Sequence, residues 1–362
     1  MFSENQKISR RQLQRLLVVD WLGKAGLLLP HVSERATGRD FMISLLLGMA
    51  ITLCYAWLIG WISKYVQVGF YTYIRNRLGG GVARGVSVIY ICYIFVNTVY
   101  LVSVFAAIAT TFMLPESSPY LLMGMVLLGG VYMAAGGLEA GARVGEILYG
   151  VVLYPLAFML LFAAFAIQPD YLKAGQVTFN YRTARHGLEI FTTFGGMGVI
   201  LFLSPYMSKK EAIAAALKKS TVTIGIGIFL TFLVCIGLFG ESGMWATSWP
   251  VITLMSSVDI PGGFLRRWEV IFTGLLLASF FVAVAIGLFY MRFLMREVLG
   301  RDRPSYLPVV TVLVFGVTFW CGSYETAGQV MTVVNGCIMV PLAIFFTLLI
   351  AVVEFVKRRK GM

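Results

Sequence analysis

Residues Phe41 to Ile62 read FMISLLLGMAITLCYAWLIGWI, a run of 22 positions without a charged side chain. A helix needs about 20 mostly apolar residues to cross the hydrocarbon core of a bilayer, so this stretch is long enough for one crossing. Similar runs extend from Ile147 to Ile167 and from Phe272 to Phe289. Because transmembrane barrels instead show alternating patterns of about ten residues, these unbroken runs predict membrane-spanning helices.

The composition extends this prediction to the whole chain. Its 362 residues are 59% hydrophobic and only 13% charged, whereas about 25% of the residues of a soluble domain are charged. We therefore expect an all-α polytopic membrane protein, with residues 1–362 forming a single integral membrane domain. The five cysteines lie within apolar segments and are expected to be small packing residues, not disulfides or metal ligands.

Charged residues between the apolar runs divide the chain into about ten predicted spans. They are residues 12–32, 41–62, 84–113, 120–136, 146–168, 187–207, 220–240, 267–291, 306–322 and 328–353. Ten spans form two sets of five. Because five is odd, the second set must enter the membrane from the opposite side, which predicts an inverted repeat of residues 12–168 and 187–353.

The distribution of lysine and arginine predicts the orientation, because these residues accumulate on the cytoplasmic side. The segments on the side of the N-terminus hold 21 of them, and those on the other side hold seven. Both termini are therefore expected to be cytoplasmic. A basic inner face next to anionic lipid also accounts for the net charge of +12 without a nucleic-acid partner.

The first and sixth spans each contain a glycine cluster near the middle. These clusters are Gly23-Lys24-Ala25-Gly26 and Gly195-Gly196-Met197-Gly198. Glycine inside a helix is about 1 kcal/mol less favourable than alanine, and paired interruptions in the two halves are typical of a transporter binding site. We therefore predict broken helices 1 and 6. The alternative is that these glycines only allow close helix packing.

Two ionisable residues lie inside the first span. Asp20 and Lys24 are four positions apart, so an intact helix would place them on one face as an ion pair. Charged groups at this depth are usually paired or functional. One alternative is that the pair is purely structural. The other is that the Lys24 ammonium supplies a fixed positive charge. That charge would attract a substrate carboxylate, or it would stand where related transporters bind sodium.

Other spans offer polar side chains for the wall of a pocket. Asn97 and Tyr100 share one face of the third span, and Ser279 lies in the eighth. Such residues also serve ordinary helix packing. The chain has no phosphate-binding loop, nucleophile elbow or zinc-protease motif, and only two histidines. We therefore expect no enzyme activity, no catalytic residues, no metal and no cofactor.

Several stretches in order along the chain resemble one protein family. They are Ile8 to Leu13 (ISRRQL), Ser204 to Lys210 (SPYMSKK), Trp249 to Ile252 (WPVI) and Phe264 to Glu269 (FLRRWE). Together with the glycine breaks, they resemble the spore germination permeases, the B subunits of nutrient germinant receptors. This family lies within the amino acid-polyamine-organocation superfamily. The resemblance covers essentially the whole chain and implies a five-plus-five inverted repeat.

The resemblance implies that the protein senses a small nutrient, typically an amino acid, in the inner membrane of a spore. It also implies two partners, a receptor A subunit and a lipoprotein C subunit. The ligand residues that it implies are Gly23, Lys24, Ala25 and Gly26 in the first break, and Thr193, Phe194, Gly195 and Gly196 in the sixth span.

Phe194 would act as an aromatic lid over the ligand. Two positions depart from the family pattern. Met197 stands where relatives often have an acidic residue, and Lys24 stands where they usually have no lysine. The second departure implies a changed ligand preference or a block to coupling ions.

Three functions stay open at this point. The first is a germinant-sensing subunit whose conformation is read by its partners. The second is an amino acid permease that works by alternating access, with a proton or with no coupling ion. The third is a ligand-opened path for small cations. Genes for A and C subunits beside this one would favour the sensor.

Overall fold

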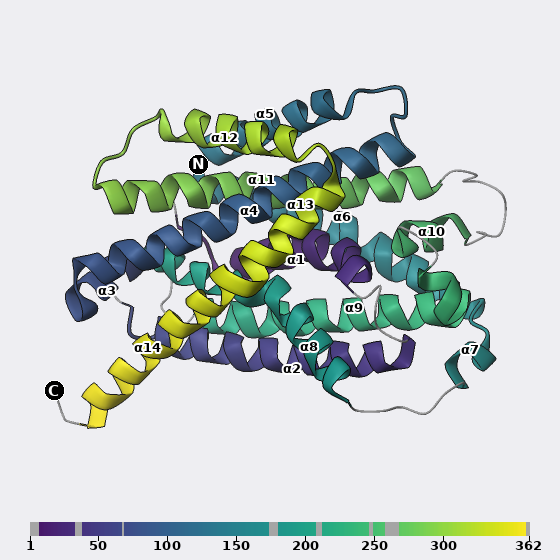
Figure 1. The fold of residues 1–362 in the computed structure, drawn as a ribbon, viewed down its shortest axis with the longest axis horizontal. Coiled ribbons are helices and arrows are strands. Elements are labelled where there is room, and N and C mark those ends of the chain that lie inside the picture. The colour runs from purple at the N-terminus through teal and green to yellow at the C-terminus, as the bar shows by residue number, and fades with distance from the viewer. Residues whose placement is uncertain are drawn as a thin grey trace.

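The computed structural model describes residues 7–32, 38–66, 69–173, 180–207, 212–245, 249–257 and 268–359. Within these ranges the chain is helical and has no β-strand beyond a single bridge between Ile8 and Met207. The long helices run mostly along the longest axis of the molecule (Figure 1). The chain therefore has the all-α architecture that its composition predicts.

The first half of the chain supplies five long helices and two short ones. They are α1 (Arg10–Val32), α2 (Gly38–Ser63), α3 (Phe70–Leu78), α4 (Gly80–Phe112), α5 (Pro119–Ala135), α6 (Gly137–Phe165) and α7 (Pro169–Lys173). The long ones coincide with the first five predicted spans. The short helices α3 and α7 lie at opposite ends of the bundle (Figure 1).

The second half repeats the pattern of five spans but varies the type of helix. Its elements are α8 (Tyr181–Phe194), the 3-10 helix η1 (Gly195–Tyr206), α9 (Ala212–Trp245), α10 (Pro250–Ser257), α11 (Trp268–Leu299), α12 (Tyr306–Cys321), α13 (Tyr324–Met331), the π-helix η2 (Thr332–Met339) and α14 (Val340–Arg359). Two spans are composite: α8 continues into η1, and α13 continues through η2 into α14.

The outer surface of the bundle is apolar. In the described residues, seven helical segments are long and apolar enough to cross a membrane, while α5 and α12 are shorter apolar helices. Tyr132, Phe165 and Trp320 have more than 80% of their surface exposed. Such large exposed apolar groups mark a surface that water does not cover, so the protein is an integral membrane protein.

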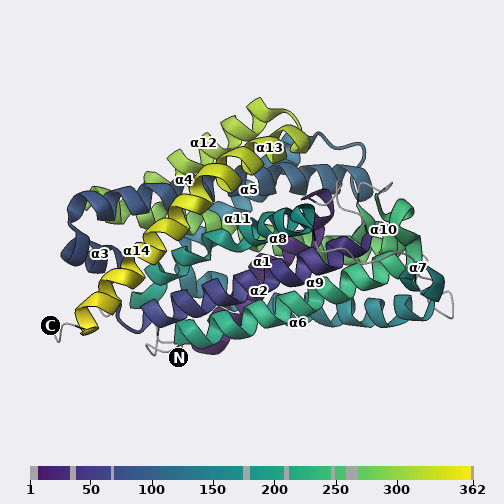
Figure 2. The same ribbon diagram turned by 60° about the horizontal axis from the view of Figure 1, so that its bottom comes forward.

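Helix α1 lies inside the bundle, where it packs against α6, α8, α9 and α11 (Figure 2). Helix α4 packs along α11 and also contacts α13 and α14. The third long helices of the two halves, α4 and α11, are thus in direct contact beside α1. This arrangement brings parts of four spans together around one interior space.

The structure corrects the prediction of a break in the first span. Helix α1 continues as an α-helix from Arg10 to Val32, through Gly23 and Gly26. A Cβ atom at Gly23 would lie only 3.4 Å from the backbone nitrogen of Phe280 in α11. Gly23 therefore serves close packing, the alternative reading of the cluster. Each glycine lowers helix stability by about 1 kcal/mol, whereas a backbone group without a partner in hydrocarbon costs several kcal/mol.

The sixth span changes its hydrogen-bonding pattern but has no extended segment. The α-helix ends at Phe194, and a 3-10 helix runs from Gly195 to Tyr206. The 3-10 form keeps i to i+3 hydrogen bonds, and a stretch of it within a span often marks a functional hinge. The glycine cluster thus marks the residue where α-helical bonding changes to 3-10 bonding. The helix is not interrupted there, as the predicted break would require.

Several contacts gather the N-terminal arm, α3 and the end of α14 at one end of the bundle. The backbone N–H of Ile8 donates to the carbonyl oxygen of Tyr206 over 2.8 Å. The rings of Phe70 and Phe202 pack edge to face with centroids 4.9 Å apart. Glu354 binds Tyr73 and Arg77 of α3. The two termini therefore share one side, and the assignment of that side to the cytoplasm stays a prediction.

Glu354 is the buried member of this terminal cluster. Its side chain is 5% exposed, accepts a hydrogen bond from the Tyr73 hydroxyl and lies 3.2 Å from Nη2 of Arg77. Burial, and then the hydrogen bond to Glu354, raise the pKa of Tyr73. The phenol therefore remains protonated at neutral pH and remains a donor to the carboxylate.

Tyr73→Phe removes only the hydroxyl that donates to this buried carboxylate. Because hydrogen bonds to charged groups contribute about 1.5 to 3 kcal/mol, and the phenol is half-buried, we expect unfolding to become easier by about 1 to 2 kcal/mol. The measurement is thermal unfolding of the purified protein in detergent. Tyr71→Phe, two positions earlier on α3, is the matched control. Equal melting temperatures for the two variants would show that the α3–α14 contact is not stabilising.

Candidate functional site

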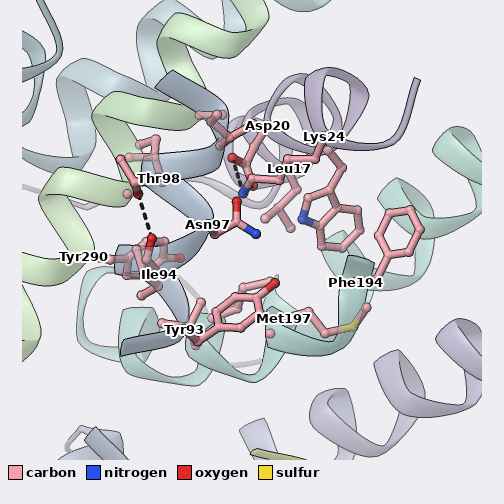
Figure 3. Close-up of a pocket in the computed structure, with 18 of the residues that line it drawn as sticks. Leu17, Asp20, Lys24, Tyr93, Ile94, Asn97, Thr98, Phe194, Met197 and Tyr290 are labelled. Carbon is pink, nitrogen blue, oxygen red and sulfur yellow. Dashed lines mark hydrogen bonds and ion pairs between the residues drawn. The ribbon is translucent and has the colours of Figure 1, made fainter. Parts of the chain in front are cut away.

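A cavity lies between α1, α4, the α8–η1 junction and α11 (Figure 3). Its volume is about 50 Å³. Seven polar side chains converge on it from the four elements: Asp20, Lys24, Tyr93, Asn97, Thr98, Thr193 and Tyr290. An interior cavity with convergent polar groups is the usual form of a small-molecule site.

Helix α1 contributes the charged pair. Nζ of Lys24 lies 2.8 Å from Oδ2 and 2.7 Å from Oδ1 of Asp20, with the hydrogen bond going to Oδ2. The side chain of Asp20 is 9% exposed and that of Lys24 is 20% exposed. The predicted ion pair is thus present, and the regular α-helix places both members on the cavity face.

Helix α4 contributes the opposite wall. Asn97 points toward the Asp20–Lys24 pair, while Tyr93 lies one turn away on the same face (Figure 3). The Thr98 hydroxyl donates to the carbonyl oxygen of Ile94 over 2.8 Å. That internal bond uses the Thr98 proton, so Asn97 is the α4 group best placed to meet a ligand beside the charged pair.

The glycines of η1 allow neighbouring side chains to approach its backbone. A Cβ atom on Gly196 would lie 1.9 Å from Cε1 of Tyr93, and one on Gly198 would lie 2.0 Å from the hydroxyl of Tyr90. A Cβ on Gly195 would lie 2.3 Å from Val340. No side chain fits at these three positions, so the cluster lets α4 and α14 reach the 3-10 backbone that forms one cavity wall.

An aromatic pair closes one side of the cavity. The rings of Trp21 and Phe194 meet edge to face, with centroids 5.7 Å apart and planes at 79°. Both residues line the cavity, and both are more than nine-tenths buried. Phe194 thus lies in the cavity wall, and its ring partner on α1 is Trp21; its role as an aromatic lid stays a prediction.

The π-helix η2 holds the outer side of the α4 wall. Asn335 donates through Nδ2 to the carbonyl oxygen of Tyr93 over 3.2 Å, and it is 2% exposed. Further along the same span, the hydroxyl of Thr347 in α14 lies 3.1 Å from the hydroxyl of Tyr55 in α2. Single π-turns are frequent at functional sites. Here the π-helix joins the backbone of a cavity residue to the last span.

The structure places five of the predicted ligand and wall residues in the cavity lining, and Asp20 of the predicted ion pair with them. The five are Lys24, Asn97, Thr193, Phe194 and Gly196. Ala25 and Gly26 lie within α1, but the structure does not describe their side chains. The other predicted residues, Gly23, Tyr100, Gly195 and Ser279, are not in the lining.

Tyr100 and Ser279 lie beside the cavity lining but are not part of it. Tyr100 continues the face of Tyr93 and Asn97, but its ring lies 3.2 Å from where a Cβ of Gly328 would be. Ser279 precedes the lining residue Ala283 by four positions and lies beside Gly23. On α4 the lining continues past Tyr100 to Leu101, so Tyr100 is turned to one side of the cavity, whereas Ser279 lies one turn before Ala283. Periodicity shows which residues share a face, but it does not show which face the cavity takes or how far the cavity extends along it.

Sequence reasoning missed several lining residues on α11 and η1. Tyr290 follows Ala283 and Gly287 on one helix face, so small residues at i and i+4 leave space beneath a tyrosine. That spacing was a usable signal. Met197 also lines the cavity, where the resemblance raised the expectation of an acidic residue. Its apolar side chain makes this part of the wall uncharged.

A second cavity of about 220 Å³ lies at the terminal end, between the start of α3, the end of η1 and α11. Its charged residues, Arg296 and Glu297, lie 3.5 Å apart, and Arg296 also approaches Asp302 to 3.7 Å. These charges are largely satisfied by one another. In the part of the chain that the structure describes, no three metal-ligating side chains come together. The inner cavity is therefore the candidate site.

Comparison with known sequences identifies one family. The profile of the spore permeases, described as "Spore germination protein", matches residues 7–330. Spore germination protein YndE of Bacillus subtilis (strain 168) is 25% identical over 327 residues, covering 86% of this chain and 88% of its own. Spore germination protein KB of the same organism is 22% identical over 366 residues, covering 99% and 97%.

Comparison with solved structures identifies the fold. MhsT in complex with L-phenylalanine superposes with a TM-score of 0.64 at 15% identity, covering 91% of this chain and 86% of its own. A sodium-coupled sialic acid symporter gives 0.63 at 12% identity, covering 94% and 81%. At such low identity the likeness shows a shared fold. The chain thus has the fold of polytopic transporters.

The contact between Gly196 and Tyr93 is testable by substitution. Because a methyl group at residue 196 would overlap the Tyr93 ring, we expect Gly196→Ala to lower the free energy of unfolding by about 3 kcal/mol. Gly227→Ala is the matched control, since no atom lies within 4 Å of its added Cβ and alanine favours the helix by up to about 1 kcal/mol. Thermal unfolding in detergent measures both.

A double-mutant cycle separates this contact from a general effect on η1. In a Tyr93→Ala background, the ring that blocks residue 196 is gone, so Gly196→Ala should cost much less than in the native protein. An undiminished loss in that background would mean that another neighbour, not Tyr93, excludes a side chain from this position.

Proposed function

This chain belongs to the spore permease family of spore germination proteins, and from that premise we propose that it is the nutrient-sensing membrane subunit of a germination receptor. The ligand is a small nutrient, typically an amino acid, bound in the inner cavity. The residues that contact it are Lys24, Thr193, Phe194 and Gly196, with Asp20 and Asn97 beside them. The receptor A subunit and the lipoprotein C subunit are its partners.

The observation that carries this proposal is the buried, charged cavity at the meeting point of α1, α4, η1 and α11. Polar and ionisable groups inside a membrane protein are expensive to bury and usually mark a substrate or ion pathway. Lys24 and Asn97 face one another across the space (Figure 3). A purely structural bundle of this size would not need these groups around an interior space.

Sensing follows if the ligand binds one arrangement of the four helices better than another. The 3-10 helix η1 supports such a change, because it shares its wall with Phe194 and contacts α3 at the terminal end through Phe202. A shift of η1 would alter the terminal end of the bundle. We place this end at the cytoplasmic face of the spore inner membrane, where the A subunit would read the state.

An amino acid permease is the second candidate function. The fold likeness to transporters, with TM-scores of 0.63 to 0.65, favours it specifically, because alternating access uses this same helix arrangement. The two functions share one binding site. Uptake of labelled amino acids into vesicles that contain only this protein separates them: accumulation above protein-free vesicles supports a permease, and binding without accumulation supports a sensor.

Asn97→Leu tests the cavity as the nutrient site, because leucine keeps the size of the side chain but removes its polar atoms. We expect at least a tenfold rise in the amino acid concentration that gives a half-maximal thermal shift, and the same rise for germination of spores that carry the variant. Tyr100→Phe, one turn further along α4 and outside the cavity, is the control. A nutrient response unchanged by Asn97→Leu in a well-expressed protein would refute this site.

A further inference from the structure

We infer, building on the proposed function, that Asp20 and Lys24 read the two charges of a zwitterionic ligand. In the empty cavity the two side chains neutralise each other. On binding, the ligand ammonium pairs with Asp20 and the ligand carboxylate pairs with Lys24, so the internal ion pair opens. The pair then determines specificity by the charge pattern of the ligand.

The position of the pair supports this role. Both side chains line the cavity, and both come from adjacent turns of one unbroken helix. The Nζ atom lies within 2.8 Å of both carboxylate oxygens. Because the helix holds the two stems one turn apart, a ligand that carries both charged groups on one carbon atom can reach the two side chains at once.

The carboxylate of Asp20 is incompletely satisfied. Its Oδ1 atom is buried, and although it lies near Nζ it accepts no hydrogen bond from any described residue. Buried polar atoms are nearly always hydrogen-bonded. Oδ1 is therefore ion-paired with Lys24 but still free to accept a hydrogen bond, and because it lines the cavity a ligand N–H can donate to it.

Opening of the pair makes room for a ligand between the two charges. With Nζ of Lys24 within 2.8 Å of both oxygens of Asp20, no ligand atom fits between the charged groups as they stand. Lysine has a flexible four-carbon stem, so rotation of Lys24 away from Asp20 provides space and exposes both charges. Opening the pair and admitting the ligand are thus one event.

Electrostatics then explain selection between ligands. A zwitterion replaces one ion pair by two and leaves no charge unpaired. A simple amine satisfies Asp20 but leaves the Lys24 ammonium buried without a partner, and a simple carboxylic acid does the reverse. A buried charge that loses its partner is strongly destabilising, so singly charged analogues should be rejected.

The remaining wall defines the rest of the ligand. Trp21, Phe194 and Met197 present apolar surface next to the charged pair. We therefore assign the ligand to α-amino acids with apolar side chains. Side chains supply the charge recognition because the backbone of α1 remains hydrogen-bonded within its own helix.

The test compares each amino acid with the analogue that lacks one charge. The probes are leucine with 3-methylbutylamine and 4-methylpentanoate, and phenylalanine with phenethylamine and 3-phenylpropanoate. Thermal shift of the full-length protein, purified with its partner subunits if these are needed for stability, gives the apparent affinities. We expect the native protein to bind at least one amino acid 30-fold or more tightly than its amine and its acid.

Single neutral variants should invert this preference. Lys24→Gln leaves only the Asp20 charge, so the amine should bind at least as well as the amino acid. Asp20→Asn leaves only the Lys24 charge, so the acid should gain in the same way. The double variant, which carries both substitutions, buries no charge and should fold but lose the preference for zwitterions. Arg185→Gln and Glu189→Gln, in the exposed ion pair of α8 with 3.0 Å between Nε and Oε1, are the matched controls.

Two results would overturn the assignment while the proposed function stands. One is a native protein that binds the amino acid and its amine within threefold of each other, or that responds only to an uncharged nutrient such as a sugar. The other is a folded Lys24→Gln or double variant that keeps the preference for the zwitterion. No response to any nutrient, even with the partner subunits present, would overturn both the assignment and the proposed function.

Discussion

The structure depends on one constraint: in the hydrocarbon of a bilayer, backbone N–H and C=O groups find partners only within the protein. Three spans show how the chain meets it. Helix α1 continues through its two glycines without a break. The sixth span changes to 3-10 bonding at Gly195, and the last span passes through a π-helix from Thr332 to Met339. In the sixth and last spans the spacing of the hydrogen bonds changes while the helix continues, so these spans vary in helix type and do not unwind.

Because the backbone stays bonded to itself, recognition falls to side chains. Asp20 and Lys24 bring the charges, and Asn97 faces them from α4. The glycines of η1 have a different task from the one their pattern suggested, since Gly196 and Gly198 make room for Tyr93 and Tyr90. The ring of Tyr93 sits on Gly196 while its carbonyl accepts from Asn335. One residue thus connects the cavity wall to both helices whose hydrogen bonding departs from the α form.

The fold was largely predictable from the sequence, and the site only in part. The apolar runs predicted the helices, since the thickness of the bilayer sets the length of each run. In the described residues, seven helical segments are long and apolar enough to cross a membrane and two more are shorter apolar helices. Helical periodicity pointed to α4 and α11, yet Tyr100 is turned to one side of the cavity and Ser279 lies one turn before its lining. The break expected in α1 was wrong, because a weak local preference of glycine competes with the much larger need to satisfy the backbone.

The sequence by itself determined what depends on neighbours along the chain. It determined the class of protein, the order of the spans and the Asp20–Lys24 pair, whose members are held one turn apart by local helix geometry. The tertiary structure alone decided which residues share the cavity and what each glycine contacts. Tyr93 and Asn335 are 242 positions apart in the chain, and a period of 3.6 residues indicates the direction of a side chain but not the depth at which two helices meet. That depth follows from packing between spans, which a single sequence does not encode locally.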